Sequence, residues 1–302
     1  MAEGTSALFE KEIELPDAGL TAFSQRLVGF KPRYERVQSD LKLLIDSEGI
    51  EAWSRKHYQK SIAILQSLRE RYPLIVFYGD VGTGKTATAE ALSNAIAKDM
   101  GKEATLFKLS TRVRGSGQVG EMSFLINQAF DVVTKEAGKS RLAFLVIDEA
   151  DSLASMRSQK QSHHEDKVAV NTLIQKIDDV RKLNGRVVVF MCTNRFETID
   201  PAILRRAAFV EEFKRPNPTE RQELFQMDCA DLGLGEAAII ELVNLTEPKG
   251  SEPGFTYSDI RTKILPEAVS AAYPSRRIEM DDLKQAVRRT KPSPSIYAGS
   301  EA

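Results

Sequence analysis

The sequence predicts an α/β fold, with a five-stranded, mostly parallel sheet in a large domain and a small helical lid domain after it. Two observations carry this prediction. Apolar, β-prone runs alternate with segments of helical periodicity as far as about residue 213, and only helical patterns remain after Pro216 and Pro218. Two of the apolar runs end in polar residues, at the position where open α/β sheets bind ligands.

Length and composition indicate one large domain or two smaller ones in a chain of 302 residues. The charge is balanced, with 42 basic and 43 acidic side chains, so we expect neither a nucleic-acid partner nor a membrane surface. Cys192 and Cys229 form no disulfide framework or zinc signature. With no signal-peptide pattern and no apolar run of about 18 residues, we expect a cytoplasmic protein.

The chain divides into four predicted parts. Residues 1–23 are an N-terminal arm, 24–216 the large domain, 217–290 the helical lid and 291–302 a disordered tail. Helical patterns over 27–44 and 50–71 precede the first strand. The tail follows from its Pro-Ser-Pro composition.

The first predicted strand, 74–78, leads into a phosphate-binding motif. The motif fits G-x-x-x-x-G-K-[S/T] and is followed by a helix over 88–100, with Gly101 as its C-cap. Strand, glycine loop and helix together make an anion site. Lys85 would reach the β- and γ-phosphates, and Thr86 would ligate Mg²⁺. The predicted nucleotide contacts of the loop are Gly79, Asp80, Val81, Gly82, Thr83, Gly84, Lys85 and Thr86.

The strongest apolar run, 141–147, ends in Asp148-Glu149. This pattern is typical of a Walker B strand, which delivers two carboxylates at its carboxyl end. Asp148 would hold Mg²⁺ through water, and Glu149 would orient and activate an attacking water. Before this run we expect a strand over 105–109, a mobile glycine-containing loop over 110–122 and a helix over 124–137.

A further buried strand, 186–192, ends in Thr193-Asn194. Asn194 would hydrogen-bond the γ-phosphate or the water, although a strand-capping role is the alternative. A short helix over 199–206 then carries Arg205 and Arg206. An arginine there would reach a neighbouring subunit's γ-phosphate, and a surface salt bridge is the alternative for at least one of the pair. His163 and His164 sit in a polar segment and favour a solvated loop over a metal site. A last strand over 209–213 precedes the helices of the lid.

This order of motifs resembles an AAA+ ATPase over residues 24–290. The resemblance implies ATP and Mg²⁺ as cofactors, a homohexameric ring and a polypeptide substrate drawn into a central pore. Val28 and Gly29 become candidate adenine contacts. Gln118, Val119 and Gly120 fall where the family carries a pore loop, with Gln118 in place of the usual aromatic residue.

Within that group, 199–216 and 254–266 are similar to the pachytene checkpoint protein 2 family, which remodels HORMA-domain proteins. Arg206 matches the single arginine of that family better than Arg205. The family's sensor arginine falls near Ser258, and Arg261 is a candidate to replace it. The sequence shows no sizeable N-terminal docking domain before the motifs. In this respect it resembles the short bacterial relatives found in antiphage defence systems. Those are thought to disassemble a HORMA protein from its signalling nucleotidyltransferase.

The resemblance therefore implies a ring-forming, ATP-driven remodeller of a HORMA-domain protein. The alternative is a DNA-associated AAA+ ATPase of the clamp or helicase loader type, in which Arg112 and Arg114 would contact phosphates. A small-molecule P-loop kinase would need no arginine from a second subunit. Residues 148–151 also spell the DEAD helicase box, but the chain has room for only one P-loop lobe.

Overall fold

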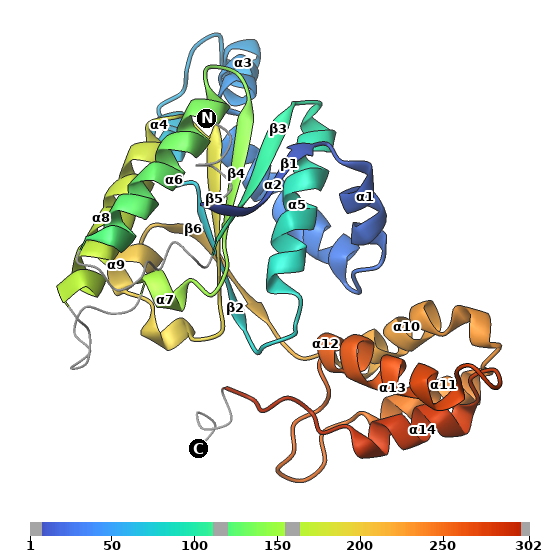
Figure 1. The fold of residues 1–302 in the computed structure, drawn as a ribbon. Coiled ribbons are helices and arrows are strands. Elements are labelled where there is room, and N and C mark those ends of the chain that lie inside the picture. Colours follow the sequence, from blue (N-terminus) through green and yellow to red (C-terminus); the bar gives the residue numbers. More distant parts are fainter. Residues whose placement is uncertain (1–7, 111–119, 155–163, 297–302) are drawn as a thin grey trace. The chain divides into compact units, whose positions relative to one another are not determined.

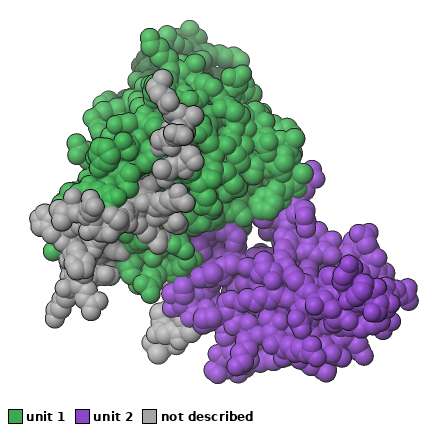
Figure 2. Space-filling view, viewed as in Figure 1, with its two compact units in different colours: residues 1–24, 30–78, 86–211 green, residues 25–29, 79–85, 212–302 purple. Residues whose placement is uncertain are grey.

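The computed structural model describes residues 8–110, 120–154 and 164–296. The chain forms two compact units, coloured separately in Figure 2. Unit 1 comprises residues 1–24, 30–78 and 86–211, and unit 2 comprises 25–29, 79–85 and 212–302. Residues 25–29 and 79–85 thus belong with the C-terminal part of the chain, although they come much earlier in the sequence.

Unit 1 is built around a six-stranded sheet in the order β1-β3-β4-β5-β2-β6. Strands β3, β4, β5 and β2 run parallel, and β1 pairs antiparallel with β3. The predicted α/β class is confirmed, with one strand more than expected. The strands are β1 Phe9–Leu15, β2 Leu74–Gly79, β3 Ala104–Leu109, β4 Leu142–Ile147, β5 Val187–Thr193 and β6 Ala207–Phe213.

The additional strand, β1, lies within the segment that we expected to be an arm. Phe9 and Leu15 are buried at its two ends, whereas the glutamates between them are exposed. This alternation with period two is the normal signal of a half-buried strand, but charged residues dilute it. Natural edge strands often carry charged side chains, which discourage pairing with other chains. The residues that obscured β1 in the sequence therefore suit its position at the edge of the sheet.

Helices cover both faces of the sheet in unit 1. In Figure 1, α6 and α8 lie on one side and α5 and α2 on the other. Every residue of β4 and β5 is therefore buried, as expected for central parallel strands. The helices are α1 Ala18–Gln25, α2 Phe30–Ile45, α3 Ser47–Tyr58, α4 Ile64–Arg69, α5 Lys85–Met100, α6 Glu121–Ala137, α7 Asp151–Ala154, α8 His164–Arg181 and α9 Pro201–Leu204.

Unit 2 is helical, and its own core includes Val28, Leu224, Phe225, Leu242 and Leu283. A π-helical turn over Ile260–Ile264 joins α12 to α13, so the helix continues from Tyr257 to Ala272 and is wound more widely in the middle. The helices are α10 Pro218–Asp228, α11 Glu236–Leu245, α12 Tyr257–Asp259, α13 Leu265–Ala272 and α14 Met280–Arg289. Among the helices that the structure describes, none is long and apolar enough to cross a membrane.

Candidate nucleotide-binding site

The predicted phosphate-binding loop follows β2 and ends where α5 begins at Lys85. Gly79, Gly82 and Gly84 have φ of +141°, +76° and +92°, which favour glycine. A Cβ on Gly79 would lie 2.1 Å from the Phe213 carbonyl oxygen, and one on Gly82 would lie 2.7 Å from the Ser258 Cβ. Both conformation and close approach therefore require glycine at positions 79 and 82.

Lys85 lies within the loop that it belongs to. Its Nζ donates to the carbonyl oxygens of Gly79, at 2.9 Å, and Asp80, at 2.7 Å. The Thr83 hydroxyl also donates to the Asp80 carbonyl, at 2.8 Å. These hydrogen bonds join the two ends of the loop and so stabilise its conformation. The Lys85 side chain lies inside the loop, whose backbone N–H groups would bind phosphate.

The Asp80 carboxylate is held by residues far away in the sequence. It accepts hydrogen bonds from Arg215 Nε at 2.6 Å, from the Ser295 hydroxyl at 3.0 Å and from the Ile296 backbone N–H at 2.9 Å. Burial alone would raise the pKa of Asp80, but these hydrogen bonds outweigh it and hold the pKa below its usual range. Asp80 is thus a charged side chain inside a loop of the type that binds anions.

The beginning of α12 contacts the same loop. The Ser258 backbone N–H donates to the Gly82 carbonyl at 3.1 Å. Ser258 is the position nearest to the family's sensor arginine, and this hydrogen bond places its segment against the loop. Arg261, the predicted replacement, instead donates to both oxygens of Asp228, at 2.6 and 3.0 Å. Its contact with nucleotide stays a prediction.

The two predicted adenine contacts lie in the short segment of unit 2 that precedes α2. Val28 is 7% exposed and packs into the helical core of the unit, which includes Leu224 and Phe225. Gly29 has a φ of +70°, which turns the chain toward α2. Packing therefore explains Val28, and its role toward adenine also stays a prediction.

In unit 1 the carboxyl ends of β4 and β5 place predicted residues side by side. Ile147 pairs with Met191, so Asp148 and Asn194 both follow the ends of paired parallel strands. The Glu149 N–H donates to Asp148 Oδ1 at 2.9 Å, and Glu149 has a φ of +47°, which is uncommon outside glycine. Lys108 Nζ lies 3.8 Å from Asp148 Oδ2 and adds positive charge beside the carboxylate.

Sequence reasoning missed a pair of side chains that fixes this edge. The Thr193 hydroxyl donates to Asp151 Oδ1 at 2.9 Å and accepts from the Arg195 backbone N–H at 2.9 Å. The bonds connect the end of β5 to the beginning of α7 and hold the chain on both sides of Asn194. The only signal in the sequence was the threonine of the Thr-Asn pair at the strand tip.

Of the two candidate arginines, Arg206 is engaged and Arg205 is exposed. Arg206 donates to Asp178 Oδ1 at 2.7 Å and Oδ2 at 3.1 Å, and to the Ala202 carbonyl at 2.8 Å. Its guanidinium also lies 5.4 Å from the centre of the Tyr72 ring. The pair with Asp178 raises the pKa of Arg206, so the side chain remains charged.

Part of the predicted substrate pore lies outside the described residues, namely Gln118 and Val119, as do Arg112, Arg114, Arg157 and His163. Gly120 is described; it is the N-cap residue that precedes α6 and has a φ of +86°. Within residues 8–110, 120–154 and 164–296, no group of three or more His, Cys, Asp and Glu side chains is arranged to hold a metal ion.

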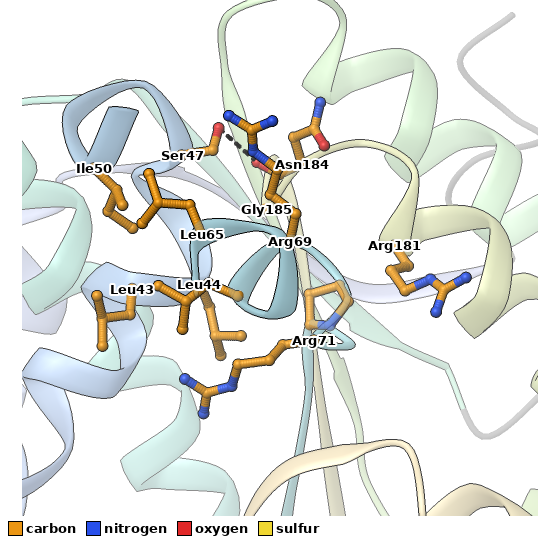
Figure 3. A pocket seen from close by; sticks show the side chains of 12 residues that line it. Leu43, Leu44, Ser47, Ile50, Leu65, Arg69, Arg71, Arg181, Asn184 and Gly185 are labelled. Atoms are coloured by element: carbon orange, nitrogen blue, oxygen red, sulfur yellow. Dashed lines mark hydrogen bonds between the residues drawn. The ribbon is translucent and has the colours of Figure 1, made fainter. Parts of the chain in front are cut away.

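A separate hollow in unit 1 lies among α2, α3, α4 and the turn after α8 (Figure 3). Leu43, Leu44 and Leu65 form its apolar side, and Arg69, Arg71 and Arg181 stand around it. None of the predicted nucleotide, metal or catalytic residues lines it. The hollow therefore has no part in the site described above.

Comparison with known proteins identifies the class of this fold and loop. The model of the ATPase family associated with various cellular activities (AAA) matches residues 75–216. Those residues include the P-loop, Asp148, Glu149, Asn194 and Arg206. The chain therefore contains an AAA domain, and the resemblance stated from the motifs is confirmed.

Full-length relatives narrow the class to a family. CD-NTase-associated protein 6 of Escherichia coli strain KTE188 is 50% identical, over 96% of this chain and 97% of its own length. The protein of the same name from strain MS 115-1 is 40% identical, over 96% of both chains. The chain belongs to the CD-NTase-associated protein 6 family.

Solved structures agree with this assignment. A chain of the E. coli MS115-1 HORMA:CdnC:Trip13 complex superposes with a TM-score of 0.88 at 39% identity, covering 96% of this chain and 98% of its own. Rhizobiales Trip13 superposes with a TM-score of 0.71 at 31% identity, covering 95% and 100%. Caenorhabditis elegans PCH-2, at 19% identity and a TM-score of 0.68, shares the fold.

Proposed function

We propose that this protein is a ring-forming ATPase that remodels a HORMA-domain protein and so releases it from a signalling nucleotidyltransferase. The observation that carries the proposal is the likeness, along 96% of this chain, to a chain from a complex that contains HORMA and CdnC proteins. The reaction is hydrolysis of ATP to ADP and phosphate, and its free energy is used to unfold part of the partner.

Each predicted residue has a role in that reaction. Lys85 binds the β- and γ-phosphates, and the loop amides and the beginning of α5 add further donors. Glu149 accepts the proton of the attacking water, and Asn194 holds that water in position. Arg206 of a neighbouring subunit stabilises the charge that develops in the transition state, which requires a closed ring such as a hexamer.

The oxygen donors in the sequence suit magnesium. Thr86 supplies a hydroxyl and Asp148 a carboxylate, and Lys108 lies near that carboxylate at 3.8 Å. Hard oxygen ligands of this kind, few in number and completed by water and phosphate, are what Mg²⁺ prefers. When bound, the ion neutralises phosphate charge.

Movement of the substrate falls to the segment before α6. Gln118, Val119 and Gly120 would contact the polypeptide in the pore, with Val119 supplying the apolar grip that an aromatic residue supplies elsewhere. Val28, Gly29 and Arg261 would sense the bound nucleotide from unit 2. The loop positions from Gly79 to Thr86 would bind its phosphates.

Replacing Glu149 with Gln tests the proposal. We expect phosphate release to fall by about 10²–10⁴-fold, the usual contribution of a general base, while ATP remains bound. Native mass spectrometry with ATP and a HORMA-domain protein should then show a six-subunit ring that retains the partner. Glu197→Gln, an exposed glutamate in the turn after β5, is the matched control and should behave as wild type. A wild-type enzyme that hydrolyses ATP yet never separates the HORMA protein from its nucleotidyltransferase would contradict the remodelling role.

A further inference from the structure

Residues 293–296 form a strap within unit 2 that joins two buried aspartates. We expected disorder from residue 291, yet the strap makes specific hydrogen bonds in the structure. At one end, the Ser295 hydroxyl and the Ile296 N–H donate to Asp80 in the phosphate-binding loop, at 3.0 and 2.9 Å. At the other, Ser293 donates to Asp259 through its N–H, at 3.0 Å, and its hydroxyl, at 2.7 Å. Asp80 and Asp259 are 7% and 1% exposed.

Arg215 connects the strap to the loop with all three of its guanidinium nitrogens. Nε donates to Asp80 Oδ2 at 2.6 Å, Nη1 to the Gly254 carbonyl at 2.6 Å, and Nη2 to the Ser293 carbonyl at 2.8 Å. The side chains of Arg215 and Asp80 are only 14% and 9% exposed. A guanidinium satisfied in this way is fixed in orientation, so the strap and the loop are tied to one charged centre.

The Asp259 end also leads to the loop. Asp259 accepts from the Thr256 N–H at 3.1 Å and, with the Thr256 hydroxyl bonded in return, closes the capping box of α12. Ser258 lies two residues after Thr256, and its N–H donates to the carbonyl of Gly82 in the phosphate-binding loop at 3.1 Å. Burial would raise the pKa of Asp259, but the bonds from Lys263, Ser293 and Thr256 hold it well below its usual range.

An aspartate in a phosphate-binding loop needs an explanation. Its charge opposes a polyanion, and the opposition grows when water is excluded. At Asp80 the charge is offset by Arg215, and its lone pairs are occupied by Ser295 and Ile296. The Asp80 carboxylate therefore points to the strap. The Asp80 carbonyl accepts hydrogen bonds from Lys85 and Thr83 within the loop.

We propose that Arg215 and the strap are positioning elements of the nucleotide site, which compensate Asp80 and hold the loop in the conformation that accepts a triphosphate. This inference rests on the proposed ATPase function. It makes nucleotide affinity depend on residues that are 135 and 215 positions away from Asp80 in the sequence.

The test measures binding of fluorescent ATP and ADP analogues, with Mg²⁺, to the full chain. Arg215→Gln should weaken ATP binding by about tenfold or more and ADP binding by less, because ATP carries the greater negative charge. Asp80→Asn in the same chain should restore ATP binding to within about threefold of wild type, since the uncompensated charge is then removed. A purely structural role for Arg215 predicts neither the ATP preference nor the rescue.

The strap itself is tested by Ser295→Ala combined with Ile296→Pro, which removes both donors to Asp80 and should raise KM for ATP by about threefold or more with little change in kcat. This variant also decides the matter if Arg215→Gln does not fold. Arg276→Gln breaks an Arg–Asp pair elsewhere in unit 2, and Ser251→Ala changes an exposed serine; both should bind ATP as wild type does. Wild-type affinity in the Arg215 and strap variants overturns the inference alone, whereas a wild-type chain that binds no ATP overturns the proposed function with it.

Discussion

Two arginine–aspartate pairs in this protein have similar geometry and different surroundings. In unit 1, Arg206 and Asp178 are 2.7 Å apart, and their side chains are 23% and 36% exposed. In unit 2, Arg215 and Asp80 are 2.6 Å apart, with exposures of 14% and 9% and further hydrogen bonds on both partners. Exposed pairs contribute little to stability, whereas breaking a buried pair leaves an uncompensated charge.

The contrast indicates different uses of one interaction. A pair that water reaches is easily exchanged, so in the proposed ring Arg206 would leave Asp178 for the phosphate of another subunit. A buried pair with additional donors is permanent, which suits Arg215 as a support for the loop. We therefore expect changes at Arg206 to affect catalysis and changes at Arg215 to affect binding and stability.

The largest expected effect is on catalysis and concerns Arg206, which belongs to the more exposed of the two pairs. Arg206→Ala should lower the ATPase rate by about 10³-fold or more, which is the range for an arginine supplied across an interface. Asp178→Asn should leave the rate within about threefold, because it removes only the resting partner. Steady-state phosphate release measures both. Mixing Arg206→Ala with Glu149→Gln subunits should recover turnover, since each supplies what the other lacks.

Arg205→Ala is the matched control, because Arg205 is its exposed neighbour in the sequence. It should retain a rate close to that of wild type. If Arg205→Ala abolishes hydrolysis and Arg206→Ala does not, the two arginines have exchanged roles and the Asp178 pair is structural.

Stability gives the next largest difference between the pairs. Arg215→Gln should lower the free energy of unfolding by about 3 kcal/mol, near the lower end for a broken buried pair. Asp178→Asn should lower it by less than about 1 kcal/mol, as for most exposed pairs. Urea titration followed by circular dichroism compares them. Equal losses would mean that burial does not distinguish the two pairs.

The same contrast shows how far sequence reasoning reached. The α/β class and the AAA motifs could be predicted because each depends on a short, local pattern, such as the glycine loop between a strand and a helix. The sheet register then brings Asp148 and Asn194 to one edge, since parallel strands end together. Strand β1 was missed because its charged residues hide the alternation that defines it.

The partners of the charged residues could not be predicted. Asp80 is joined to Arg215 and Ser295 across 135 and 215 positions, and no local pattern carries that information. The pairing of Arg261 with Asp228 likewise depends on how α10 packs beside the π-helical turn. Side-chain partners at such separations are decided by tertiary packing, which periodicity does not describe.

Acid should lower the stability of unit 2, where the buried pair lies. Three aspartates of unit 2, Asp80, Asp259 and Asp282, have a lowered pKa. Arg276 donates two hydrogen bonds of 2.6 Å to Asp282 and lowers its pKa to about 2, with help from the Glu279 N–H. Because an unfolded aspartate titrates near pH 4, the contribution of Asp282 to the free energy of unfolding is fully present above that pH and is lost as pH falls toward about 2.

Calorimetry should therefore show a smaller fall in Tm between pH 5 and pH 3 for Asp282→Asn than for wild type. Asp281→Asn, which changes the exposed neighbour of Asp282, is the control and should follow wild type. An Asp282→Asn curve parallel to wild type would mean that Asp282 is not a source of the acid sensitivity.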